Sequence, residues 1–134
     1  MLIVVDSSAF LSILLGEPDA GQIASSLQSA SQRISSAVTI YETRTVLLRR
    51  ADRRYLDPFE SLLSVADLKQ HAFDERQADI ASQAYARFGR GSGSPAKLNL
   101  ADCASYALAI SLDAPLLYKG NDFAQTDVRS ALTD

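Results

Sequence analysis

Several residue types are scarce in this chain, and each scarcity excludes a class of protein. Cysteine occurs once, at Cys103, so an internal disulfide is excluded and a reducing compartment is favoured. The only histidine is His71, and no cluster of His and Cys offers a zinc site. The apolar run 9–15 is far too short to span a bilayer, and Met1–Val5 lacks the basic segment of a signal peptide. We therefore expect a cytoplasmic protein without a membrane segment.

The charge balance also narrows the function. The formal net charge of −3 argues against a protein whose whole surface binds nucleic acid. If this chain binds RNA, local basic groups and metal ions must make the contact. The length of 134 residues, with 47% hydrophobic residues, predicts one globular domain over 1–134.

Short apolar segments alternate with helical patterns along the chain. Leu2–Val5 is apolar on both faces, as a central parallel strand would be. Further strands are expected at 33–37, 68–73 and 115–118. Helices are expected at 9–15, from 18, from 39, near 58, at 75–88, at 100–112 and in the C-terminal tail. The fold class predicted is α/β, a doubly wound parallel sheet of about four to five short strands flanked by helices.

Acidic residues stand where these strands give way to helices or turns, and helix capping can explain each one alone. Asp6 follows the first strand as an N-cap would, and Thr39-x-x-Glu42 has the spacing of a capping box. Asp102 lies in the first turn of its helix, and Asp122 lies in a turn-like sequence.

Taken together, the four acidic positions predict a shared site. The carboxyl ends of parallel strands meet at one edge of the sheet, where a crevice can gather Asp6, Glu42, Asp102 and Asp122. Crowded carboxylates repel one another, and a hard divalent cation such as Mg²⁺ or Mn²⁺ relieves the repulsion. Such ions can activate water for cleavage of a phosphodiester bond.

The segments around these acids resemble the PIN-domain family, and more closely its VapC-type toxins of bacterial toxin–antitoxin pairs. The resemblance covers nearly the whole chain. The segments that carry it are Ile3–Ala9, Ser36–Glu42, Leu98–Cys103 and Gly120–Phe123.

The resemblance implies an acidic metal site that cleaves single-stranded or looped RNA and leaves 5′-phosphate and 3′-hydroxyl ends. It implies Mg²⁺, with Mn²⁺ possible, a homodimer, and a cognate antitoxin in the catalytic groove. The family's acids match Asp6, Glu42, Asp102 and Asp122, and Ser8 and Asn121 stand where polar groups often accompany them. Many relatives carry a histidine in the loop before the third motif, whereas this chain has 91–95 without one.

Two groups of basic residues are candidates for contacts. We expect RNA phosphates to be held by basic residues near the acidic edge, namely Arg87, Arg90, Lys97 and Lys119. A second group is either a solvated face or a contact for RNA or antitoxin; it comprises Arg44, Arg49, Arg50, Arg53 and Arg54. His71 is expected to be a surface or strand residue, and Cys103 a buried one.

Three functions remain to be compared. The leading one is a metal-dependent endoribonuclease toxin. A phospho-receiver signalling domain would share the doubly wound sheet and an acidic Mg²⁺ site, with Lys119 after its last strand. It also needs a phosphoacceptor Asp at the end of a central strand. A catalytically silent binding domain of the same fold would use the arginine-rich helix for its partner.

Overall fold

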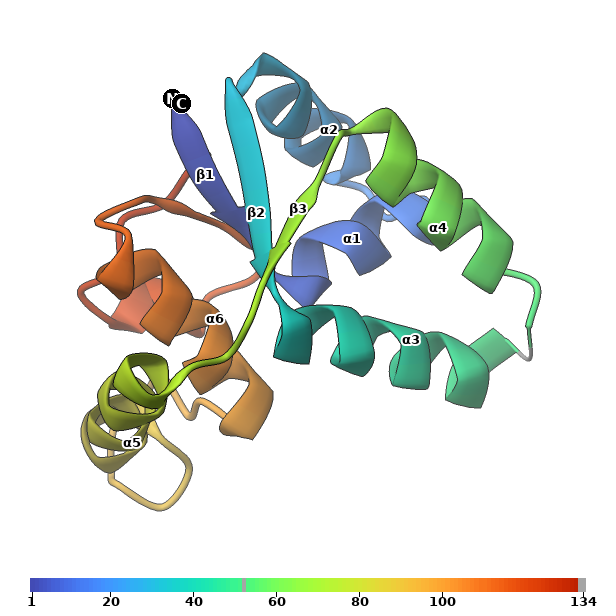
Figure 1. The fold of residues 1–134 in the computed structure, drawn as a ribbon. Coiled ribbons are helices and arrows are strands. Elements are labelled where there is room, and N and C mark those ends of the chain that lie inside the picture. The colour runs from blue at the N-terminus through green and yellow to red at the C-terminus, as the bar shows by residue number, and fades with distance from the viewer. Residues whose placement is uncertain (52, 133–134) are drawn as a thin grey trace.

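The computed structural model describes residues 1–51 and 53–132. Over these residues, four strands form one parallel sheet in the order β3-β2-β1-β4 (Figure 1). The strands are β1 (Leu2–Val5), β2 (Gln32–Ser36), β3 (Lys69–His71) and β4 (Leu116–Leu117). The helices are α1 (Ser7–Leu14), α2 (Ala20–Ser29), α3 (Ala37–Ala51), α4 (Leu56–Val65), α5 (Glu75–Phe88) and α6 (Leu100–Ser111), followed by the 3₁₀ turn η1 (Phe123–Gln125). The predicted doubly wound α/β fold is confirmed.

The order of the strands creates a switch point beside β1. The chain runs outward from β1 through β2 to β3, and then returns to place β4 on the other side of β1. Val4 pairs with Leu116 and Val5 with Leu117, so β1 and β4 end together. Ligands of open α/β sheets bind at such a reversal, beyond the carboxyl ends of the strands. Asp6 and the segment 118–122 leave the sheet at this point.

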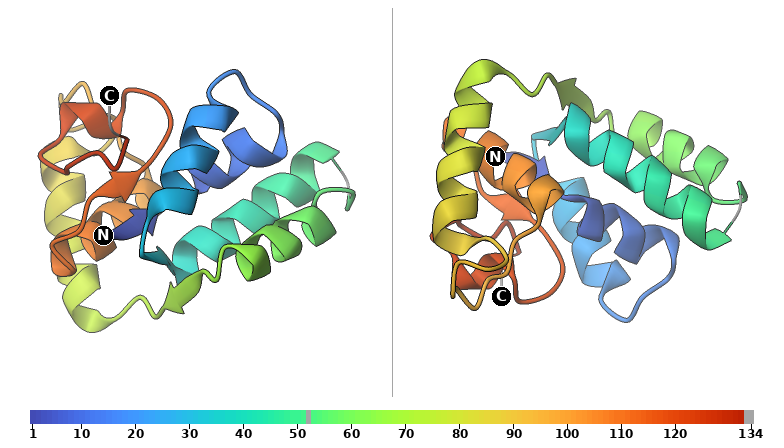
Figure 2. Two further views of the ribbon diagram at one scale, coloured as in Figure 1. Left: turned by 90° about the horizontal axis from the view of Figure 1, so that it is seen from above. Right: turned by 90° about the horizontal axis from the view of Figure 1, so that it is seen from below.

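Helices cover both faces of the sheet. Successive strand residues point to opposite faces, so neighbouring residues of β1 enter different cores. Val4 packs into a core with α5 and α6, which includes Tyr106 and Leu108. Ile3 and Val5 pack into the other core, with the helices α1 to α4. Figure 2 shows this separation from above and below, with α3 and α4 extending away from the sheet as a pair.

The start of α3 differs from the sequence prediction. The helix begins at Ala37 and not at Thr39, and the Ser36 hydroxyl accepts a hydrogen bond from the Val38 N–H at 3.1 Å. Thr39 is fully buried within the helix. The proposed Thr39–Glu42 capping box is therefore wrong, because the residue that caps the start of the helix is Ser36.

The tail differs too. Beyond η1 the described residues up to 132 contain no helix, so the predicted helical tail is wrong. The tail instead runs along β4, where the Leu116 N–H donates to the Arg129 carbonyl and the Ala131 N–H to the Leu116 carbonyl, both at 2.8 Å. These bonds cover an edge strand that would otherwise leave its backbone groups unpaired.

A membrane span requires a helix of sufficient length and apolarity. Within 1–51 and 53–132, no helix is both long and apolar enough to cross a membrane.

Candidate active site

Asp6 is held rigidly at the end of β1. Its carboxylate caps α1, with Oδ2 accepting from the Ser8 N–H at 3.0 Å and from the Ser8 hydroxyl at 2.7 Å. The other oxygen, Oδ1, accepts from the Ser105 hydroxyl at 2.6 Å. Only 1% of Asp6 is exposed. The capping role expected from the sequence is present, and the second oxygen is directed toward α6.

Two buried hydroxyls join α3 and α6 to this carboxylate. The Ser105 hydroxyl lies 3.0 Å from that of Thr39, and both residues are fully buried. Because Ser105 donates to Asp6, the Thr39 hydroxyl donates to Ser105 in this chain of bonds. The sequence reasoning missed Ser105. It stands one helical turn after Asp102, and that spacing could have placed it on the same side of α6.

Asp102 combines a capping role with an unfavourable charge environment. It forms a capping box with Asn99, in which Asp102 Oδ2 accepts from the Asn99 N–H at 2.9 Å. Burial, together with the charges of Asp6, Glu42 and Asp122, raises the pKa of Asp102 to about 7, against the hydrogen bond from Asn99, which lowers it. Asp102 thus responds to all three other acids, so the structure brings the four predicted side chains into one electrostatic neighbourhood.

Glu42 has no such structural role. Its Oε1 atom is buried and has no hydrogen-bond partner. Burial raises the pKa of Glu42, the neighbouring Ser7 side chain lowers it, and the charge of Asp6 raises it. A buried carboxylate oxygen without a donor is costly, so this atom is available to a ligand.

Asp122 is the exposed member of the group. It precedes η1, but its side chain makes no capping hydrogen bond. Asn121 is exposed beside it. Ser8 ties this segment to the site, since its hydroxyl accepts from the Lys119 N–H at 3.0 Å. Capping therefore explains Asp6 and Asp102, but neither Glu42 nor the side chain of Asp122.

The chemistry of these donors fits a divalent cation. Among the described residues, no group of three or more His, Cys, Asp or Glu side chains is arranged to hold a metal ion as it stands. Mg²⁺ does not require such a cage, because it keeps several waters and binds through one or two carboxylates together with substrate phosphate. The unpartnered Glu42 oxygen and the raised pKa of Asp102 are both relieved by a cation.

The four basic residues expected near this edge fall into two pairs. Arg87 lies 3.8 Å from Asp127 and stacks over the Phe88 ring at 4.5 Å. Lys119 Nζ lies 3.0 Å from Glu17 Oε2 and 3.9 Å from Asp19 Oδ1. Arg90 and Lys97 instead line a depression of about 540 Å³ together with Asp122.

The single histidine and the single cysteine both lie outside the group of four acids. His71 ends β3, and its Nδ1 lies 3.2 Å from the Gln77 amide and 2.8 Å from the Ala72 carbonyl. Cys103 is buried as expected, and burial, with the charge of Asp102, raises the pKa of its thiol to about 11.

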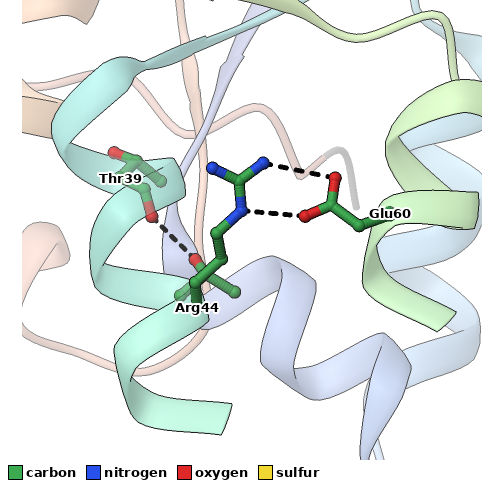
Figure 3. A network of polar contacts seen from close by, with 4 residues as sticks. Thr39, Arg44 and Glu60 are labelled. Atoms are coloured by element: carbon green, nitrogen blue, oxygen red, sulfur yellow. Dashed lines mark hydrogen bonds and ion pairs between the residues drawn. The ribbon is translucent and has the colours of Figure 1, made fainter. Parts of the chain in front are cut away.

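The arginine-rich helix has at least one ordinary surface contact. Arg44 on α3 forms a two-pronged ion pair with Glu60 on α4, at 2.8 and 3.2 Å, with about half of each side chain exposed (Figure 3). Arg49 and Arg50 lie in the last turn of α3, where positive charge favours the helix dipole. Arg53 and Arg54 follow the helix.

Comparison with known proteins places the chain in a family. The PIN domain model matches residues 3–129. Ribonuclease VapC28 of Mycobacterium tuberculosis is 46% identical over 129 residues, which cover 96% of this chain and 97% of the relative. Ribonuclease VapC42 of the same organism is 39% identical over 130 residues, with 97% and 99% covered.

Solved structures show the same fold. VapC20 of Mycobacterium tuberculosis, described as a toxin that cleaves the sarcin–ricin loop, aligns with a TM-score of 0.74 at 19% identity, covering 94% of this chain and 95% of that one. A chain of VapBC2 from Rickettsia felis, solved with a fragment of promoter DNA, aligns with a TM-score of 0.73 at 11% identity, with 97% and 96% covered. The chain described here belongs to the PIN-domain family and, within it, to the VapC proteins.

Proposed function

We propose that this protein is a metal-dependent endoribonuclease that acts as the toxin of a toxin–antitoxin pair. One observation carries the proposal: four acids from separate segments meet at the switch point, and the charges of three of them raise the pKa of Asp102. A site that concentrates negative charge in this way suits the hydrolysis of a phosphodiester through divalent cations. Membership of the VapC group supplies the class of substrate, RNA.

The acids have different tasks in this proposal. Asp6 and Asp102 hold the cation from fixed positions, because each carboxylate is already oriented by hydrogen bonds. Glu42 contributes a free buried oxygen, and Asp122 an exposed carboxylate. When bound, the cation supplies a Lewis acid that promotes ionisation of water and neutralises charge on the phosphate. Mg²⁺ is the preferred ion, and Mn²⁺ has the same preference for oxygen ligands.

Ser8 and Asn121 are proposed to support the acids. Ser8 donates to Asp6 and accepts from the backbone of Lys119, so it links the two segments that leave β1 and β4. Asn121 adjoins Asp122 and provides amide groups at the exposed side of the site. Arg87, Arg90, Lys97 and Lys119 remain the proposed contacts for RNA.

The partners follow from the family. We place the protein in the cytoplasm, with a cognate antitoxin that covers the acidic site. We also propose a homodimer, formed where large apolar side chains surround a groove of about 720 Å³ between α3, α5 and α6. Tyr41 and Leu100 on this groove are 70% and 82% exposed, and Glu42 also lines the groove. Light scattering should give a dimer for the wild type and a monomer for Leu100→Glu.

The phospho-receiver alternative has less support. Of the two central strands of the described sheet, β2 ends at Ser36 and offers no aspartate, and Asp6 after β1 is buried and already accepts hydrogen bonds from Ser8 and Ser105. Incubation with a small phosphodonor tests this directly, since a stable aspartyl-phosphate would contradict the nuclease.

The proposed function is tested with purified protein, a mixed RNA pool and either Mg²⁺ or EDTA. We expect cleavage in Mg²⁺ only, with 5′-phosphate and 3′-hydroxyl ends. Cleavage that persists in EDTA would contradict metal dependence, and an intact pool in both Mg²⁺ and Mn²⁺ would favour the silent binding domain. Expression with and without the adjacent reading frame tests the biological role, because an antitoxin should relieve growth arrest.

A further inference from the structure

The loop between α5 and α6 is closed at its neck. Gly89 forms a bridge with Leu98, the Arg90 N–H donates to the Leu98 carbonyl at 3.1 Å, and the Leu98 N–H donates to the Phe88 carbonyl at 2.9 Å. Gly89 is required there, since a Cβ would lie 2.4 Å from the Tyr85 carbonyl oxygen. Leu98 is fully buried and anchors the neck. Arg90 follows Gly89 and Lys97 precedes Leu98, so both residues adjoin the bridged pair.

The backbone at the neck is kept in an uncommon conformation. Lys97 has a φ of +51°, in the left-handed region that a lysine rarely adopts. Such conformations persist only where the surroundings impose them, and they gather at functional sites. Ala96, fully buried, and Leu98 fix the chain on either side of Lys97. The fold therefore sets the backbone conformation at Lys97, and with it the direction in which this exposed side chain leaves the loop.

These two cations share a depression with the acidic site. Arg90, Gly91, Gly93, Ser94, Lys97 and Asp122 line a hollow of about 540 Å³. Asp122 marks its acidic end, because the charge of Asp122 acts on Asp102. Within residues 1–51 and 53–132, neither Arg90 nor Lys97 enters an ion pair, whereas Arg87 and Lys119 both do. The hollow is thus negative at one end and positive, without a countercharge, at the other.

We propose that Arg90 and Lys97 form a subsite for a phosphate of the RNA backbone next to the phosphate that is cleaved. This inference rests on the proposed nuclease function. The acidic end takes the scissile phosphate through divalent cations, and the neck takes its neighbour on the same strand. A protein of net charge −3 gains little general attraction for RNA, so a local pair of free cations is the expected means of holding it. The subsite recognises the backbone and carries no base specificity.

The test uses binding, so that it does not depend on cleavage. In an Asp6→Asn background, the affinity for a fluorescein-labelled single-stranded RNA of mixed sequence is measured against salt concentration. Arg90→Gln with Lys97→Gln removes the contact to one phosphate, so it should lower the slope of log K against log salt by about 0.7. The matched control, Lys69→Gln with Arg129→Gln, removes the same charge far from the acidic crevice, near the amino ends of β3 and β4. There these residues pair with Asp67 and Asp113. The control should keep the slope of the parent.

The outcomes separate the two proposals. An unchanged slope in the Arg90/Lys97 variant, or an equal fall in both double variants, overturns the subsite even if the wild type cleaves RNA. If the wild type does not cleave RNA but the slope of the Arg90/Lys97 variant falls as predicted, the nuclease function is overturned and the phosphate subsite stands. A parent that binds no RNA overturns both. In active protein, the subsite predicts a raised KM with little change in kcat, and one methylphosphonate beside the cleaved bond should abolish the difference from wild type.

Discussion

Two charged regions of this molecule differ in how their charges are arranged: one pairs opposite charges, and the other gathers charges of one sign. On the arm formed by α3 and α4, Arg44 and Glu60 meet as a two-pronged pair in contact with water. In the acidic crevice of Asp6, Glu42, Asp102 and Asp122, charges of one sign crowd together, and no ion pair in the described part of the chain includes any of them. The arm is arranged as surface charges usually are, and the crevice carries a cost that folding alone does not explain.

Removing a carboxylate from the crevice should have the largest effect. Asp6→Asn should lower kcat/KM for RNA at least roughly 100-fold, because even the groups that support a metal ligand are worth about 10 to 100-fold. The amide retains the shape and can still accept the bonds of Ser8, so the protein should remain folded by circular dichroism. The matched control is Asp113→Asn, an exposed acid at the opposite edge, which should leave kcat/KM unchanged. Equal activity in wild type and Asp6→Asn would remove Asp6 from the site.

The crevice should also make the metal-free protein sensitive to pH. The pKa of Asp102 is about 7 when folded, above its ordinary value of 3.8, so protonated Asp102 favours the folded state. Its stabilising contribution is complete below about pH 4 and is lost as pH rises through 7. In EDTA at pH 8, Asp102→Asn should therefore unfold at a higher denaturant concentration than wild type. Its free energy of unfolding should be larger by up to roughly 4 kcal/mol. The gap should close toward pH 4, and a variant less stable than wild type at pH 8 would contradict the raised pKa.

The buried hydroxyls should have an intermediate effect. Ser105→Ala removes the donor to Asp6 Oδ1, so Mn²⁺ affinity measured by calorimetry should fall about 10 to 100-fold. Ser111→Ala is the control on the same helix, since that hydroxyl donates to the Leu108 carbonyl of its own helix and not to the acidic site. Equal Mn²⁺ affinity in the two variants would make Ser105 a packing residue alone.

The arm should show the smallest effect. Arg44→Gln with Glu60→Gln should change the free energy of unfolding by less than about 1 kcal/mol, because exposed ion pairs contribute little. RNA cleavage should be unaffected. A large loss of cleavage would mean that the arm takes part in the site, and the contrast between the two regions would fail.

Local patterns were enough to predict much of this fold and site. The all-apolar Leu2–Val5 indicated a central strand, and Asp102 was expected in the first turn of a helix, where the structure has it. Both features depend on near neighbours in the chain, so the sequence displays them directly. The four acids were found through their positions after strands and at helix starts, together with the family resemblance.

Contacts between distant residues could not be predicted in the same way. Thr39 has the spacing of a helix cap, yet its hydroxyl bonds to Ser105, which lies 66 residues away. The tail was expected to be helical, but its backbone bonds to Leu116 on the sheet edge. Arg87 and Lys119 resemble free cations in the sequence, and only the fold brings Asp127 and Glu17 to them. In each case a tertiary partner overrides a local preference.

The most direct test is the Mg²⁺ dependence of RNA cleavage by wild type and Asp102→Asn, prepared and folded alike. Asp102 is the residue on which the charges of the other three acids act, so its removal tests the crevice as a unit. We predict cleavage by wild type that rises with Mg²⁺ and is abolished by EDTA, and no cleavage by Asp102→Asn at any Mg²⁺ concentration. Equal cleavage by the two proteins would contradict the assignment of the acidic crevice as the active site.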